Sequence, residues 1–222
     1  GVSFSKDASL VAYSISEGGA DWRKVIVMNT ETKELVGDTI NNVKFSAISW
    51  KSNEGFYYSS YEAPEGSKLS SKTDQHILYY HKLGTEQKSD KVIFGAVPTE
   101  KNRYVRGYVT DDNRFLVIDA AIKTTGNKLF IKDLSKNLSL KTIVDNYDSN
   151  TYLLDNNGTN LILVTDFNSP NKRIVKTNFS SPSQNNWKDL IPEKEFVLSP
   201  SVCGGYIFGE YMIDAISKVY QY

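Results

Sequence analysis

A polar turn that precedes an alternating apolar strand recurs four times, and it constrains the fold more than any other feature. Asp, Asn and Gly supply the left-handed backbone and the side-chain-to-backbone bonds that a tight hairpin needs. The turns are residues 5–9, 51–55, 110–114 and 155–159, and the strands after them begin at Leu10, Phe56, Phe115 and Leu161. Measured at Asp7, Asn53, Asp112 and Asn157, successive copies lie 46, 59 and 45 residues apart. A period in the forties predicts a repeated structural unit.

Each copy continues with a further strand, a second polar turn and a last strand. In the second copy these are residues 77–81, 84–87 and 91–94. The 14 Tyr and 10 Phe favour β-structure, and no stretch sustains the apolar spacing of a helix. Four strands per repeat are typical of propeller blades, whereas a β-sandwich would not repeat the same four-strand order. We therefore predict an all-β fold, a β-propeller of four-stranded antiparallel blades.

The predicted propeller domain occupies residues 1–222 and holds about four and a half blades. The blade limits are roughly 1–42, 43–100, 101–146, 147–195 and an incomplete 196–222. Residues 62–75, a polar stretch with Gly, Pro and Ser, are expected to form a long surface loop that accounts for the 59-residue step. Because a partial ring leaves strand edges unpaired, we expect a piece of a longer protein or pairing with another copy.

Composition excludes several classes of function. The 26 basic and 26 acidic residues cancel and are spread along the chain, which argues against nucleic-acid binding. No apolar run is long enough to span a membrane. The single cysteine, Cys203, cannot form an internal disulfide, and we expect it to be a small buried apolar residue. Because a chain without disulfides occurs in either compartment, the sequence does not decide between the cytoplasm and the periplasm.

No recognisable catalytic motif occurs in the sequence. There is no Gly-x-Ser-x-Gly elbow, no phosphate-binding loop and no metal-ligand spacing, so we predict no catalytic residue, no metal and no cofactor. His76 and His81 are expected on opposite faces of a strand, as ordinary surface histidines. The aromatic residues are expected to fill the space between blades rather than to form a sugar- or peptide-stacking surface; they are Trp22, Trp50, Trp187 and the run Phe56, Tyr57 and Tyr58.

Six strings in the chain are specific enough to compare with known families: residues 4–22, 43–50, 55–61, 75–85, 165–173 and 187–193. In order and spacing they resemble the propeller of the prolyl oligopeptidase (prolyl endopeptidase) family. The most specific is Tyr79, Tyr80 and His81 followed by Leu83, Gly84 and Thr85. One departure is Ala8, where the family has a turn glycine; we expect a different turn type or strain there.

The resemblance implies a two-domain serine peptidase that cleaves short peptides after proline. In that family a seven-bladed propeller restricts entry to an α/β-hydrolase domain that carries a Ser-Asp-His triad. That domain, absent from this chain, would lie beyond Tyr222, and roughly one blade would precede Gly1. Phe45 matches the family phenylalanine that reaches into the substrate pocket, so the resemblance implies that Phe45 binds substrate. From the residues alone, Phe45 would be a core strand residue.

A second hypothesis from another class remains open at this point. The chain would then be a free-standing propeller module that binds a protein or glycan partner. A reading frame that continues beyond Tyr222 into a Gly-x-Ser-x-Gly elbow favours the peptidase, and a stop codon there favours the binding module.

Overall fold

The chain folds into antiparallel sheets of three or four strands, which confirms the predicted all-β class. The computed structural model describes residues 1–37, 39–61, 73–136 and 138–222, and in these residues it has five sheets and two short 3₁₀ helices. The predicted loop at 62–75 lies outside the described residues over 62–72. In every sheet the strands are hydrogen-bonded neighbours in chain order. This simple meander is the arrangement of a propeller blade.

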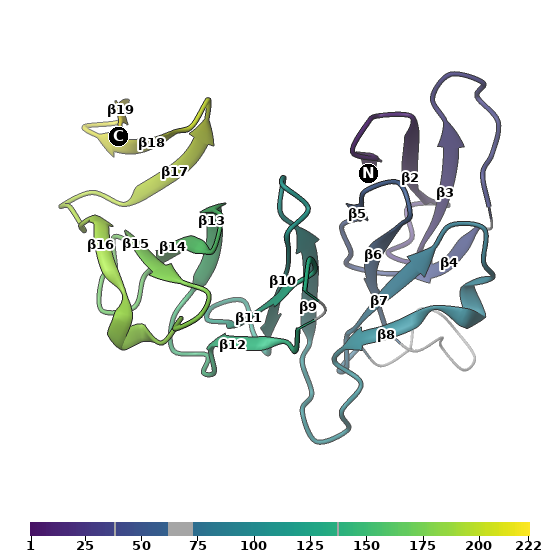
Figure 1. Ribbon diagram of the computed structural model, residues 1–222, viewed down its shortest axis with the longest axis horizontal. Coiled ribbons are helices and arrows are strands. Elements are labelled where there is room, and N and C mark those ends of the chain that lie inside the picture. Colours follow the sequence, from purple (N-terminus) through teal and green to yellow (C-terminus); the bar gives the residue numbers. More distant parts are fainter. Residues whose placement is uncertain (38, 62–72, 137) are drawn as a thin grey trace. The chain divides into compact units, whose positions relative to one another are not determined.

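In each of the first two sheets, the two edge strands are shorter than the two central strands (Figure 1). The first sheet contains β1 (Val2–Phe4), β2 (Leu10–Ser16), β3 (Arg23–Asn29) and β4 (Ile40–Val43). The second contains β5 (Ser49–Lys51), β6 (Gly55–Ser60), β7 (Ile77–Lys82) and β8 (Lys91–Phe94), with the 3₁₀ helix η1 (Gln87–Ser89) before its last strand.

The remaining strands form two further four-stranded sheets and one three-stranded sheet. The third sheet contains β9 (Tyr104–Val109), β10 (Phe115–Ala121), β11 (Lys128–Asp133) and β12 (Lys141–Val144). The fourth contains β13 (Thr151–Asn157), β14 (Asn160–Thr165), β15 (Arg173–Asn178) and β16 (Lys188–Ile191), with η2 (Gln184–Asn186) before β16. The fifth contains β17 (Leu198–Cys203), β18 (Tyr206–Ile213) and β19 (Ile216–Gln221).

The four polar turns of the sequence repeat each connect the first and second strands of a four-stranded sheet. Each turn holds one residue in the left-handed region: Ala8 (φ 58°), Ser52 (φ 50°), Asn113 (φ 57°) and Gly158 (φ 58°). In the first turn the Asp7 carboxylate accepts the Ser9 amide at 2.9 Å. Ala8 therefore adopts the conformation that glycine would take freely, which is strained for a residue with a Cβ.

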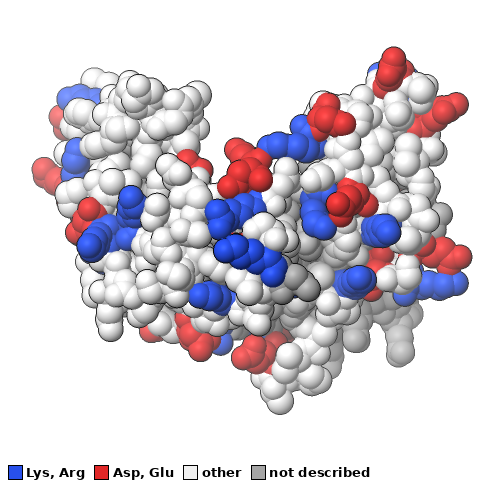
Figure 2. Space-filling view, in the orientation of Figure 1, with Lys and Arg blue, Asp and Glu red and all other residues white. Residues whose placement is uncertain are grey.

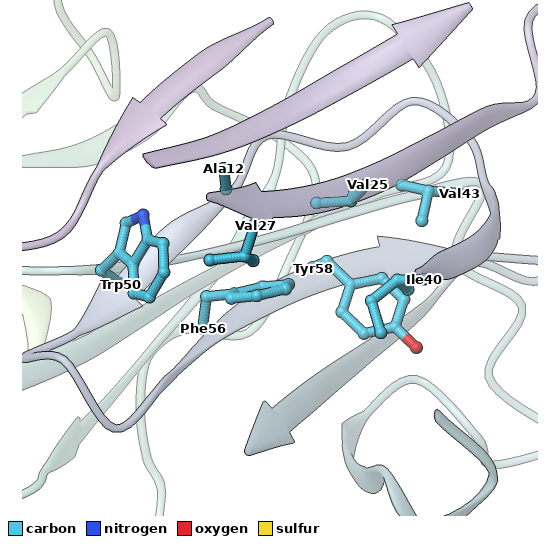
Figure 3. Packing of buried hydrophobic residues seen from close by; sticks show 8 residues of the cluster. All are labelled: Ala12, Val25, Val27, Ile40, Val43, Trp50, Phe56 and Tyr58. Atoms are coloured by element: carbon cyan, nitrogen blue, oxygen red, sulfur yellow. The ribbon is translucent and has the colours of Figure 1, made fainter. Parts of the chain in front are cut away.

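Contacts divide the chain into two units, each with its own core. The first comprises residues 1–123 and 132–139, and the second comprises residues 124–131 and 140–222. In the first unit, apolar side chains of the first and second sheets meet in one cluster (Figure 3). Trp50 and Phe56, whose rings lie 5.4 Å apart, come from the second sheet and face Val27 of β3. Both are buried, so here the expectation that aromatic residues fill the space between blades is correct.

The core of the second unit joins the fourth and fifth sheets. Its buried members are Val164, Ile174, Ile191, Leu198, Ile207 and Tyr211. The prediction that Cys203 is buried is wrong, because its side chain is exposed. Cys203 ends β17 opposite Tyr206, next to the Gly204–Gly205 turn. The buried positions of β17 lie at its Leu198 end, so the hairpin tip extends away from the packed core.

Charged side chains of both signs are intermingled on the face seen in Figure 2. Within the part of the chain that the structure describes, no helix is long and apolar enough to cross a membrane.

Candidate substrate-contact site

The loop between β4 and β5 holds Phe45 in an unusual backbone conformation. Its φ is 53°, in the left-handed region, which a bulky residue occupies only when its surroundings hold it there. The next residue supplies one such restraint, since the Ser46 hydroxyl accepts the Ser59 amide of β6 at 2.7 Å and donates to the Ala47 carbonyl at 2.6 Å. The Phe45 side chain is 50% exposed, so it is not the core strand residue that local sequence alone suggests.

Phe45 is the exposed end of a group of five rings, called here the Phe45 cluster: Trp22, Phe45, Tyr61, His76 and Tyr104. The Phe45 ring centroid lies 6.3 Å from that of Tyr61, edge to face, and 6.3 Å from that of Tyr104. Trp22 also meets Tyr61 edge to face, at 6.5 Å. Trp22, Tyr61 and His76 are buried, whereas Phe45 and Tyr104 are partly open to solvent. The cluster thus has a buried base and an exposed aromatic tip.

A lysine completes one side of the cluster. The Lys44 ammonium lies 5.2 Å from the centroid of the Trp22 ring and 5.1 Å from that of Phe45. Its side chain is only 12% exposed, and its partner carboxylate, Asp21, is 3.6 Å away. A cation over two ring faces is attracted by both rings. Lys44 therefore bridges Phe45 and the buried Trp22 ring and helps to orient Phe45.

Tyr61 links the cluster to the start of β9. Its hydroxyl donates to the Arg103 carbonyl at 2.6 Å, and its ring stacks on His76 with centroids 4.5 Å apart and planes 27° apart. Burial, followed by the neighbouring Tyr104, raises the pKa of Tyr61 to about 12. The Tyr61 hydroxyl therefore stays protonated and remains a hydrogen-bond donor at physiological pH.

The prediction that both histidines lie on the strand surface is wrong. His76 and His81 are both buried. His81 faces a carboxylate, with its Nδ1 2.8 Å from Oδ1 of Asp90, and the Tyr58 hydroxyl donates to the other oxygen of Asp90 at 2.8 Å. The alternation argument failed because both faces of this second sheet are covered: all six residues of β6 are buried.

Tyr61, His76 and Tyr104 could not be predicted from the sequence as neighbours of Phe45. Tyr104 stands 59 residues from Phe45, and a strand-edge tyrosine carries no local signal of its contacts. Trp187, by contrast, belongs to the second unit, where its indole Nε1 donates to the Pro182 carbonyl at 3.0 Å. Trp187 is only partly buried, so it does not join the core as predicted.

The chemistry that the cluster offers is binding rather than bond cleavage. The two partly exposed rings, Phe45 and Tyr104, suit an apolar group, since aromatic side chains bury much apolar area with few rotatable bonds. Within the described ranges, no group of three or more His, Cys, Asp or Glu side chains could hold a metal ion.

Comparison with known proteins gives the class of the domain. The family profile described as "Prolyl oligopeptidase, N-terminal beta-propeller domain" matches residues 1–222. Together with the four-stranded meanders, this match defines the domain as part of a β-propeller. The chain belongs to the prolyl oligopeptidase family, within its N-terminal propeller.

Individual relatives agree with this assignment. The chain is 50% identical over its whole length to a prolyl endopeptidase of Elizabethkingia meningoseptica and covers 31% of that protein. It is 29% identical to a prolyl oligopeptidase A of Amanita bisporigera, over 86% of this chain and 28% of that one. A solved structure from a study of two prolyl endopeptidases and their inter-domain dynamics superposes with a TM-score of 0.89 at 26% identity and covers 100% of this chain and 32% of that one. The chain thus spans about a third of the length of these relatives.

Proposed function

We propose that this chain is the substrate-admitting part of a serine peptidase that hydrolyses short peptides after proline. In this proposal the five sheets are blades, with limits near 1–42, 43–100, 101–146, 147–195 and 196–222. The partner is an α/β-hydrolase domain of the same polypeptide, which supplies the Ser-Asp-His triad. The proposal is supported by relatives that are named prolyl endopeptidases.

The contact with substrate is assigned to Phe45, and the observation that carries this assignment is its exposed, held position. Exposing half of a phenylalanine side chain to water is unfavourable, and a left-handed backbone is strained for a residue with a Cβ. Phe45 nevertheless keeps this position, and its ring packs on buried aromatic side chains. Such strain is concentrated at ligand-contacting sites. The exposed Phe45 ring would pack against an apolar side chain or the proline ring of a short peptide.

The test is Phe45→Ala in the peptidase that contains this propeller, with a Gly-Pro chromogenic peptide as substrate. Loss of an apolar contact made in the ground state and in the transition state raises KM and leaves kcat unchanged; we expect a rise of about tenfold. Phe4→Ala is the matched control, because Phe4 is exposed to a similar extent, 57%, and lies outside the cluster.

Equal KM values for Phe45→Ala and the unaltered enzyme would contradict the assignment of Phe45. A stop codon directly after Tyr222, together with binding of a protein or glycan by the isolated chain, would instead support the free-standing binding module.

A further inference from the structure

The imidazole of His76 is held between two backbone groups from distant parts of the chain. His76 is fully buried, directly before β7. Its Nδ1 accepts the amide of Val105 in β9 at 2.9 Å, and its Nε2 lies 2.9 Å from the Lys44 carbonyl. The His76 amide in turn donates to the Asn102 carbonyl at 2.7 Å. Two segments, the loop at Lys44 and residues 102–105, therefore converge on this one residue.

These partners determine the protonation state of the ring. A backbone amide can only donate and a carbonyl can only accept, so Nδ1 must carry a lone pair and Nε2 must carry the proton. The ring is therefore neutral. Burial lowers the pKa of His76 to about 4, which agrees with this neutral form near pH 7.

The Lys44 carbonyl is the group that connects His76 to Phe45. It belongs to the planar peptide unit that ends at the Phe45 nitrogen, so holding that oxygen limits rotation about the φ bond of Phe45. The Tyr61 ring lies flat on the imidazole and meets Phe45 edge to face. His76 thus restrains Phe45 both through the backbone and through a ring contact.

We propose that His76 is a positioning residue that holds the Lys44–Phe45 peptide and thereby keeps the Phe45 ring turned toward substrate. This proposal rests on the function proposed above, in which Phe45 contacts the peptide. His76 itself touches no reacting atom; it acts through Phe45. Its signature is therefore a change in KM that disappears when the Phe45 ring is absent.

The test combines His76→Leu with Phe45→Ala in the peptidase that contains this propeller, assayed with a Gly-Pro chromogenic peptide. His76→Leu removes both hydrogen bonds, and we expect KM to rise about fivefold with kcat unchanged. The double variant is expected to match Phe45→Ala alone, because residues that act as one unit are not additive.

Two conservative variants separate the two hydrogen bonds and guard against a failure of His76→Leu to fold. The His76→Gln side chain places an N–H near the position of Nε2 and can still donate to the Lys44 carbonyl. The His76→Asn side chain places an oxygen near Nδ1, where it accepts from Val105 but falls short of Lys44. We expect His76→Gln to retain the normal KM and His76→Asn to show the raised KM.

The outcomes distinguish the two proposals. If Phe45→Ala raises KM while His76→Asn does not, or if the effects of His76→Leu and Phe45→Ala multiply, the role of His76 is overturned and that of Phe45 stands. If Phe45→Ala leaves KM unchanged, the contact of Phe45 with substrate fails and the role of His76 fails with it.

Discussion

The two histidines near the two ends of β7 are both buried, yet their partners differ in kind. His76 bonds only to uncharged backbone groups, the Lys44 carbonyl and the Val105 amide. His81 bonds to the carboxylate of Asp90, with side chains exposed by only 1% and 3%. The His76 network ends at two partly exposed rings, Phe45 and Tyr104. The His81 network runs through Tyr58 to Gln87 and the backbone of Asn41 in β4, so it joins two sheets and ends at no exposed ring.

From this difference we expect the His81 network to contribute to the stability of the fold and the Phe45 cluster to contribute to binding. The His81 network joins β6 and β7 to Asp90, just before β8, so a change there should lower stability. The Phe45 cluster presents its exposed rings to solvent, so a change at its tip should alter binding and leave the fold intact.

The largest effect on the free energy of unfolding is expected from the substitution Asp90→Ala. It leaves His81 and the Tyr58 hydroxyl buried without their partner, and removing one member of a buried pair typically costs about 3–5 kcal/mol of unfolding free energy. Urea unfolding followed by tryptophan fluorescence measures it. The control is Glu17→Gln, at the surface pair that Glu17 forms with Lys24, where we expect little change. Equal stability of the two variants would contradict the structural role of the His81 network.

The next effect is a dependence of stability on pH that arises from His76. Its pKa is about 4 in the folded chain and 6.5 when unfolded, so the unfolded state binds more protons between these values. The unfolding free energy therefore falls as the pH drops from 6.5 to 4, by about 3 kcal/mol at 1.4 kcal/mol per pKa unit, and His76 adds nothing further below pH 4.

The measurement is urea unfolding at several pH values, with His76→Gln as the variant that cannot titrate. The ring is faced by the Tyr61 side chain, whose pKa is raised to about 12, and by the uncharged backbone groups of Lys44 and Val105, so none of these titrates between pH 4 and 6.5. The difference between the two proteins therefore isolates His76. Parallel pH curves would show that His76 is not buried in the neutral form.

A smaller effect is expected from Ser46→Ala. The Ser59 amide loses its acceptor, which should cost about 1 kcal/mol of unfolding free energy, and the loosened Phe45 loop should raise KM about twofold. Ser89→Ala is the control, since the Ser89 hydroxyl bonds only within the turn before β8, to the Glu86 carbonyl. A loss of stability with no change in KM would show that Ser46 does not position Phe45.

The fold could be predicted because its determinants are local and repeated. Asp7 and Asp112 accept the amide two residues further on, a bond that the sequence alone suggests for a hairpin turn. The second turn differs from the other three, because its left-handed residue is Ser52, which precedes Asn53 rather than following it. The Asn53 side-chain amide donates to the Asp7 carboxylate in the turn of the first sheet at 2.6 Å.

The site was only partly predictable, because its contacts join segments that are distant in sequence. Phe45 was assigned by family resemblance, and no local pattern marks its left-handed backbone. The prediction that His76 lies at the surface is wrong, because strand alternation does not reveal that Tyr61 and the Val105 amide cover it. The prediction that Cys203 is buried is wrong because a small apolar residue carries no signal of where its hairpin ends, and Cys203 lies at an exposed hairpin tip.

The most direct test of the central claim is a crystal structure of the peptidase that contains this propeller, with a proline-containing peptide bound. The proposed function predicts peptide carbon atoms within about 4 Å of the Phe45 ring, the range of apolar contact. It also predicts that Phe45 keeps its left-handed backbone and that the Lys44 carbonyl remains bonded to His76. A bound peptide that leaves the Phe45 ring in contact with solvent alone would contradict the claim.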